Sequence, residues 1–100
     1  MLRLSLHWPW ISRVAPFATL EELSAGVTAM VGRLDGAGQH AAAVELRAGY
    51  SLVLGLTDGW TDFRDAVERV WKSTSSQLNP DDRHALEVIR ASARYAMRRR

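Results

Sequence analysis

The stretch from Leu46 to Trp71 constrains the fold more than any other part of the chain. From Leu46 to Leu54, apolar residues recur three or four positions apart, which is the spacing of one face of a helix. The same spacing returns from Trp60 to Trp71 after a link of only a few residues. Because so short a link leaves no room for a crossover, we expect two antiparallel helices that lie side by side.

The first of these two helices runs from about 39 to 54 and ends at Gly55, because glycine readily takes the left-handed conformation that follows many helices. Thr57 or Asp58 then supplies the side-chain oxygen that caps the next helix. Gly49 costs about 1 kcal/mol of helix propensity, which predicts that another helix crosses closely there. From Tyr50 onward this helix is apolar almost all round, which is typical of a helix surrounded by others.

The second of the two helices, about 58 to 75, carries three large aromatic residues, Trp60, Phe63 and Trp71. Positions 60 and 71 nearly eclipse each other after three helical turns. We therefore expect all three rings to be largely buried, and the two tryptophans to face the side of the preceding helix that carries Tyr50 and Val53.

This second helix also contains oppositely charged residues four positions apart, a spacing at which side chains meet on a helix surface. Asp65 is placed to pair with Arg69, and Glu68 with Lys72. We expect these pairs to form within the helix.

Another helix precedes this pair. Thr19 and Glu22 have the spacing of a capping box, in which each side chain accepts a hydrogen bond from a free amide of the first turn. The glycines Gly36 and Gly38 mark its end. One apolar seam follows its length, formed by Leu20, Leu23, Val27, Met30 and Leu34.

The last helix has the clearest start in the sequence. Asn79 is a good cap, Pro80 suits the first helical position, and two aspartates follow at the positive end of the helix dipole. We expect it to run to about Met97 and to bury four apolar residues, Leu86, Ile89, Ala93 and Met97.

The first eight residues alternate between apolar and polar, which is the period of a half-buried strand, and Pro9 ends the pattern. We interpret residues 1–18 as an extended arm and residues 19–100 as the helical domain. The arm has three alternative roles: to pack on its own domain, to pair with its counterpart in a homodimer, or to bind a foreign partner. A targeting role is a further alternative, because the first acid in the chain is Glu21.

The expected fold class is therefore all-α: a four-helix bundle with an N-terminal extended arm. A content of 47% hydrophobic and 24% charged residues is typical of a globular domain. The absence of cysteine excludes disulfides and thiolate chemistry, and it mildly favours the cytoplasm. The longest apolar run, Leu52 to Leu56, is too short to cross a membrane.

Few residues have a spacing that indicates a catalytic or metal-binding site. Asp58, Asp62 and Asp65 share one helical face, but the helix dipole alone favours acids in a first turn, and the glycine-centred pattern of a calcium loop is missing. The three histidines lie in separate segments without a metal-ligand spacing. We therefore assign no catalytic, cofactor-binding or metal-binding residue and expect a protein that is not an enzyme.

The charges of the chain are unevenly distributed. Residues 1–82 carry seven Lys/Arg and ten Asp/Glu, a net of −3, whereas residues 83–100 carry six arginines and one acid, a net of +5. Five arginines form a basic stripe that could neutralise phosphates: Arg90, Arg94, Arg98, Arg99 and Arg100. Nucleic-acid binding through this arginine stripe is the alternative function.

The leading functional hypothesis is that the protein binds another protein as an adaptor, inhibitor or regulator. It rests on the small size of the domain, on the lack of cofactor motifs, and on aromatic residues in both the arm and the helix at about 58 to 75, since aromatics are frequent anchors of protein interfaces. Trp8 and Trp10 are the expected partner-binding residues. A homodimer formed through the arm is the related expectation.

Overall fold

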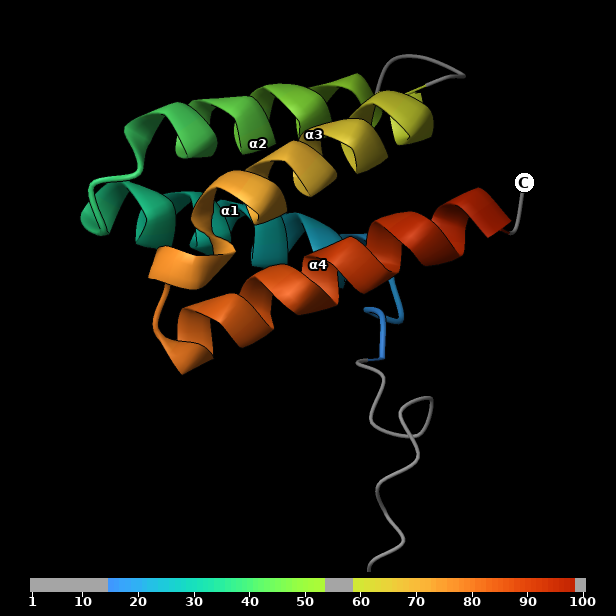
Figure 1. Cartoon of the computed structure of the whole chain (residues 1–100). Coiled ribbons are helices and arrows are strands. Elements are labelled where there is room, and N and C mark those ends of the chain that lie inside the picture. The colour runs from blue at the N-terminus through green and yellow to red at the C-terminus, as the bar shows by residue number, and fades with distance from the viewer. Residues whose placement is uncertain (1–14, 54–58, 99–100) are drawn as a thin grey trace, which may run out of the picture.

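The computed structural model describes residues 15–53 and 59–98 of the chain, and for Arg98 only the backbone. It contains four α-helices and one short 3-10 helix (Figure 1). In chain order these are α1 (Leu20–Gly36), α2 (His40–Val53), α3 (Gly59–Thr74), η2 (Ser75–Gln77) and α4 (Pro80–Arg98). The predicted all-α class and four helices are confirmed. The extended arm up to residue 14, Gly55 and the cap at Thr57 or Asp58 lie outside the described residues.

The four helices form an antiparallel bundle in which each helix packs against two others. Contacts join α1 to α2, α2 to α3, α3 to α4, and α4 back to α1. Figure 1 shows α2 and α3 side by side, with α1 and α4 completing the bundle. Every helix contributes to the core, and its largest fully buried side chains are Phe63, Met30, Leu34, Leu46, Leu86, Ile89, Val67 and Val70.

The start of α1 has the predicted Thr19 cap, and Glu22 reaches back as expected, although to the amide of the residue before the cap. Thr19 Oγ1 accepts a hydrogen bond from the Glu22 amide at 3.1 Å, and Glu22 Oε1 accepts one from the Ala18 amide at 3.0 Å. Just before the cap, the Phe17 amide donates to Ser92 Oγ on α4 at 2.9 Å. This bond fixes the entry of the chain into the bundle beside α4.

The turn between α1 and α2 is closed at Gly38, which has φ = 80°. The Gln39 amide donates to the Leu34 carbonyl at 2.8 Å, and the Gly38 amide donates to the Asp35 carbonyl at 3.1 Å. These two bonds are those of a Schellman motif, which requires a left-handed residue between helix and link. The predicted glycine end of α1 is therefore confirmed.

The predicted start of α4 is confirmed as well. Asn79 Oδ1 accepts a hydrogen bond from the Asp82 amide at 2.8 Å, and Pro80 is the first helical residue. Asp82 also forms an ion pair with Arg33 of α1 at 3.1 Å. The start of α4 is thus tied to the end of α1, as the antiparallel arrangement requires.

The close crossing predicted at Gly49 is present. A Cβ atom at Gly49 would lie 2.6 Å from the Cβ of Ala66 on α3, closer than two carbons can approach. The missing side chain therefore allows α2 and α3 to pack backbone against backbone.

Three expectations about burial were wrong. Met97, which was expected to be buried by α4, is only partly buried. Trp60 and Trp71 are only partly buried, whereas Phe63 is fully buried. At about 100° per residue, both indoles project roughly 60 to 80° away from the direction of Phe63, which points into the core. Leu20, the first residue of the expected α1 seam, is 51% exposed because its helix begins there, at the margin of the core.

Tyr50 provides a test of the core. Its ring lies edge-on to Phe63, with centroids 5.3 Å apart, and its buried hydroxyl has no hydrogen-bond partner among the described residues. Leaving such a group without a bond costs about 1 to 3 kcal/mol. We expect Tyr50→Phe to leave the free energy of unfolding unchanged or to raise it by roughly 1 kcal/mol, as measured by urea denaturation. A clear loss of stability would mean that the hydroxyl is satisfied in solution.

Candidate functional site

The side of α2 that faces away from the bundle carries an apolar stripe beside the exposed polar residues Arg47 and Ser51. Val44 is 55% exposed and Leu52 is 36% exposed, and both are among the largest exposed apolar side chains described. Ala41 and Ala48 are exposed beside them, so that the four residues follow one another in steps of three and four. We call Ala41, Val44, Ala48 and Leu52 the outer face of α2.

The outer face contradicts the expectation that α2 is surrounded by other helices. The helix packs against α1 and α3, and these cover only the side that carries its buried residues. The apolar residues on the opposite side remain in contact with water. An apolar stripe of this length on an exposed helix is a feature of interaction surfaces.

A groove of about 490 Å³ adjoins the outer face, where α2 and α3 cross. Its apolar part comprises Ala48, Gly49 and Leu52 of α2 and Ala66 of α3. Its polar part comprises Glu45, Ser51, Asp62, Asp65 and Arg69. Glu45 and Arg69 form an ion pair between the two helices. We call this hollow the α2–α3 groove.

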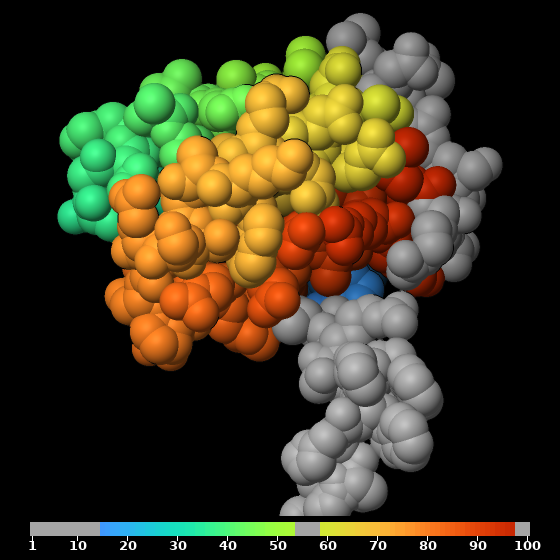
Figure 2. All heavy atoms as spheres, in the orientation of Figure 1, coloured from blue at the N-terminus to red at the C-terminus, as the bar shows by residue number. Residues whose placement is uncertain are grey.

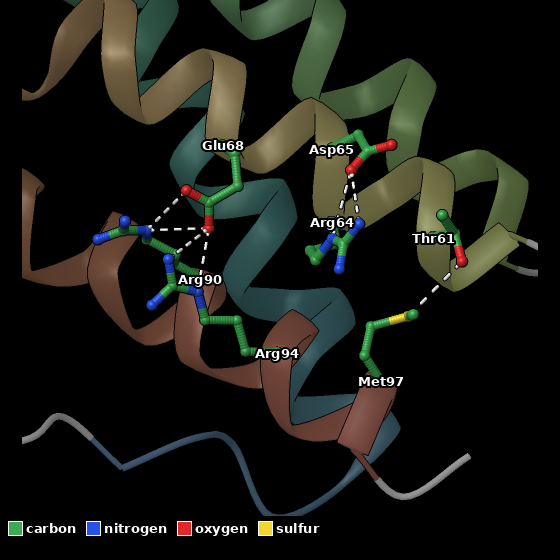
Figure 3. Close-up of polar contacts among 7 residues, drawn as sticks. All are labelled: Thr61, Arg64, Asp65, Glu68, Arg90, Arg94 and Met97. Atoms are coloured by element: carbon green, nitrogen blue, oxygen red, sulfur yellow. Dashed lines mark hydrogen bonds and ion pairs between the residues drawn. The ribbon is translucent and has the colours of Figure 1, made fainter.

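The arginine stripe has a different environment from the one expected, because an acid from α3 reaches it. The Glu68 carboxylate accepts hydrogen bonds from Arg90 Nε at 3.1 and 3.2 Å and from Arg94 Nε at 3.1 Å. Figure 3 shows both guanidinium groups directed at this carboxylate. Two of the five arginines are therefore paired within the fold.

Arg90 is held in place from a second side. Its guanidinium carbon lies 4.7 Å from the centroid of the Trp71 ring, within the range of a cation–π contact. Trp71 thus faces α4, and the prediction that it faces Tyr50 and Val53 was wrong. Figure 2 shows atoms of α3 lying against atoms of α4 on the visible face of the molecule.

Beside Glu68 lies a second hollow, of about 520 Å³, between α3 and α4. Arg64, Asp65, Glu68, Arg94 and Met97 line it. Arg64 is paired with its neighbour Asp65 at 3.0 Å, so the charged groups at this hollow are taken up by contacts within the domain (Figure 3).

The same contacts show that the ion pairs expected within α3 are replaced by others. Asp65 pairs with Arg64, and Glu68 pairs with α4 rather than with Lys72. Arg69 pairs with Glu45 on α2. Two of these contacts join neighbouring helices, which a pattern within one helix cannot predict.

The acidity of Glu68 reflects its position between two arginines. Partial burial acts to raise the pKa of its carboxyl, but the hydrogen bond and charge of Arg90, together with those of Arg94, outweigh this effect. The pKa of Glu68 is therefore lowered from its usual range. Such a shift means that the charged form stabilises the fold, fully above the unfolded-state pKa and less as the pH falls through the folded-state pKa.

We expect Glu68→Gln to lower the free energy of unfolding by about 1 kcal/mol at pH 7, because Arg90 loses its partner while only 23% exposed. As the pH falls through the folded-state pKa of Glu68, the difference from the original protein should shrink, because Glu68 then becomes protonated itself. Urea denaturation at pH 7 and at a series of acidic pH values measures this. Glu87→Gln on α4 is the matched control, and an equal effect in both variants would contradict the role of Glu68.

The expected site residues divide into two groups. Arg90 and Arg94 are described and come together at Glu68, and the backbone of Arg98 belongs to α4. Trp8, Trp10, Arg99 and Arg100 lie outside the described residues. Sequence reasoning missed the outer face of α2, although the spacing of positions 41, 44, 48 and 52 was a visible signal for it.

Among residues 15–53 and 59–98, no group of three acidic or histidine side chains is arranged to hold a metal ion. Within the same ranges, no helix combines the length and the apolar character needed to span a bilayer.

The chain was also compared with known proteins. No protein-family model, no curated protein and no solved structure matches it.

Proposed function

We propose that this domain is a non-catalytic module that binds another protein through the outer face of α2. The observation that supports this most strongly is the exposure of Val44 and Leu52 on one side of a helix whose other side forms the core. Transferring an exposed apolar side chain of this size out of water contributes roughly 1.5 to 3 kcal/mol when burial is complete. Because Val44 is 55% and Leu52 36% exposed, a partner that covered both would gain about half of that energy or less from each side chain.

The shape of the surface supports the same function. The α2–α3 groove adjoins the outer face of α2 and shares Ala48 and Leu52 with it. A partner can therefore contact the exposed side chains of α2 and the groove at the same time. Interfaces commonly combine an apolar centre with a charged rim. Here the rim consists of Glu45, Asp62 and Arg69.

The test is affinity capture from an extract of the cells that make the protein. The original protein and the double variant Val44→Glu/Leu52→Glu are used as baits, and captured proteins are identified by mass spectrometry. We expect the original protein to retain a specific partner and the double variant to lose it, because each new carboxylate would have to be desolvated at the interface.

Leu20→Glu is the matched control, since Leu20 is also an exposed leucine but lies on α1. This variant should retain the partner. The proposal is wrong if the double variant, folded as judged by circular dichroism, captures the same partner as the original protein, or if no bait captures a specific partner.

Nucleic-acid binding through the arginine stripe is the alternative. It has less support, because Glu68 takes up charge from Arg90 and Arg94. If it holds, binding to a DNA or RNA duplex should fall steeply between low and moderate salt. Deleting residues 98–100 should then flatten that dependence while changing the free energy of unfolding by less than about 0.5 kcal/mol.

A further inference from the structure

The α2–α3 groove has features that indicate the chemistry of the partner protein. An inference from them rests on the proposed function. Its floor is formed by small residues, Ala48, Gly49 and Ala66. A Cβ atom at Gly49 would lie 2.6 Å from that of Ala66, which shows how closely the two helices approach. Small side chains at a helix crossing leave a shallow furrow on its outside, into which the side-chain ridge of a third helix fits.

The charges around this floor are mostly negative. Asp62 is exposed, and the Asp65 side chain is 47% exposed. Glu45 is the third carboxylate of the groove, and Arg69, its ion-pair partner, is the only cation among the described residues that line it. Arg64, which lies beside the groove, pairs with Asp65, so three carboxylates against two guanidinium groups leave a net charge of −1, at Asp62. A partner that carries positive charge is therefore attracted to this surface, and a negative one is repelled.

From the apolar floor and the acidic rim together, we propose that the α2–α3 groove binds an amphipathic α-helix with a basic flank, supplied by another protein. Its apolar stripe packs on Leu52 and Ala48, and its lysines or arginines lie over Asp62 and Asp65. Helix-in-groove binding of this kind uses apolar anchors three and four positions apart, which match the spacing of the outer face of α2.

Charge also favours a foreign helix over a second copy of this chain. A two-fold axis through the groove would bring the same carboxylates of both copies together, and like charges at an interface repel. On α4, Arg90 and Arg94 already bind Glu68, and Arg83 donates to the backbone carbonyls of Ser75 and Leu78.

Two synthetic helical peptides test the proposal, each as long as α2, at 14 residues. Both carry the same leucine and alanine stripe, but one has lysines along its flank and the other has glutamates. Binding of the labelled peptides to the full chain is followed by fluorescence anisotropy at moderate salt. We expect the lysine peptide to bind at least about tenfold more tightly than the glutamate peptide.

Three variants locate the binding site of the lysine peptide. Asp62→Asn/Asp65→Asn should weaken it by roughly five- to tenfold, whereas Glu21→Gln/Glu87→Gln, which changes net charge equally elsewhere, should change it by less than about twofold. Leu52→Asp should weaken it by about tenfold or more although it adds an acid, because the apolar anchor is lost.

Several results would overturn the proposal. Equal binding of the two peptides would exclude recognition of charge, and equal losses in the two neutralised pairs would show attraction to net charge alone. Undiminished binding to Leu52→Asp would exclude the groove. Sedimentation of the free protein as a dimer that Leu52→Asp dissociates would assign the groove to a second copy. If neither peptide binds, this inference is wrong, whereas the proposed function is decided separately by capture with Val44→Glu/Leu52→Glu.

Discussion

Replacing Phe63 by alanine should lower the free energy of unfolding by about 3 to 5 kcal/mol, the usual loss for a fully buried phenylalanine. Phe63 is inaccessible to water and lies between two rings, with centroids 5.3 Å from Tyr50 and 6.1 Å from Trp60. Alanine would remove these edge-on contacts and leave a cavity where α2 meets α3. Thermal unfolding should show a decrease in melting temperature of more than roughly 12 °C.

Trp71→Ala on the same helix is the comparison. Its indole is larger than the ring of Phe63 but only partly buried, and one side of it is covered by the Arg90 guanidinium. We therefore expect this variant to lose roughly half as much stability as Phe63→Ala. A loss from Trp71→Ala that equals or exceeds that of Phe63→Ala would contradict the assignment of the core.

A second large effect is expected from Gly59→Ala, although it adds a single methyl group. The new Cβ atom would lie 2.1 Å from the Leu52 carbonyl oxygen and 2.9 Å from the Val53 Cα. These are backbone atoms at the end of α2, so no side-chain rotation can relieve the clash. The two helices would have to move apart, at a cost of about 3 kcal/mol or more in the free energy of unfolding.

Gly32→Ala is the matched control for this substitution. Gly32 lies within α1, and a Cβ atom there would meet nothing within 4 Å. Because alanine has a higher helix propensity than glycine, this variant should be unchanged or more stable by up to about 1 kcal/mol. Urea denaturation measures the free energy of unfolding of both variants. Similar values for Gly59→Ala and Gly32→Ala would show that α2 and α3 are not packed as described at Gly59.

The helices were predictable because their signals are local. Thr19 with Glu22, Gly38, and Asn79 with Pro80 each act on backbone groups within one turn, and each boundary was found where the sequence places it. The crossing at Gly49 was predictable for another reason: glycine within a helix is unfavourable unless a neighbour needs the space.

Interactions between helices were less predictable from the sequence. Glu68 has Lys72 four residues away, yet its carboxylate binds Arg90 and Arg94, which are 22 and 26 residues away in sequence. Helical periodicity gives the direction in which a side chain points but not which helix lies there. The arginine stripe was therefore recognised as a feature of α4, while its acidic partner on α3 was not.

The outer face of α2 was missed for the same reason. An apolar helix surface is compatible with a central helix and with an exposed interface, and only the positions of the neighbouring helices separate the two cases. Once α1 and α3 are placed against one side of α2, Val44 and Leu52 remain exposed. The helix that carries the candidate site could be predicted from the sequence. The exposure of the site could be recognised only from the packing of the neighbouring helices.

The most direct test of the central claim is photo-crosslinking from the outer face of α2 within the cells that make the protein. A benzophenone amino acid is placed at position 44 in one variant and at position 20, an equally exposed apolar site on α1, in another. We predict a covalent adduct with one specific protein from position 44 and none with that protein from position 20. Equal adducts from both positions, or an adduct from position 20 alone, would contradict the assignment of α2 as the partner-binding helix.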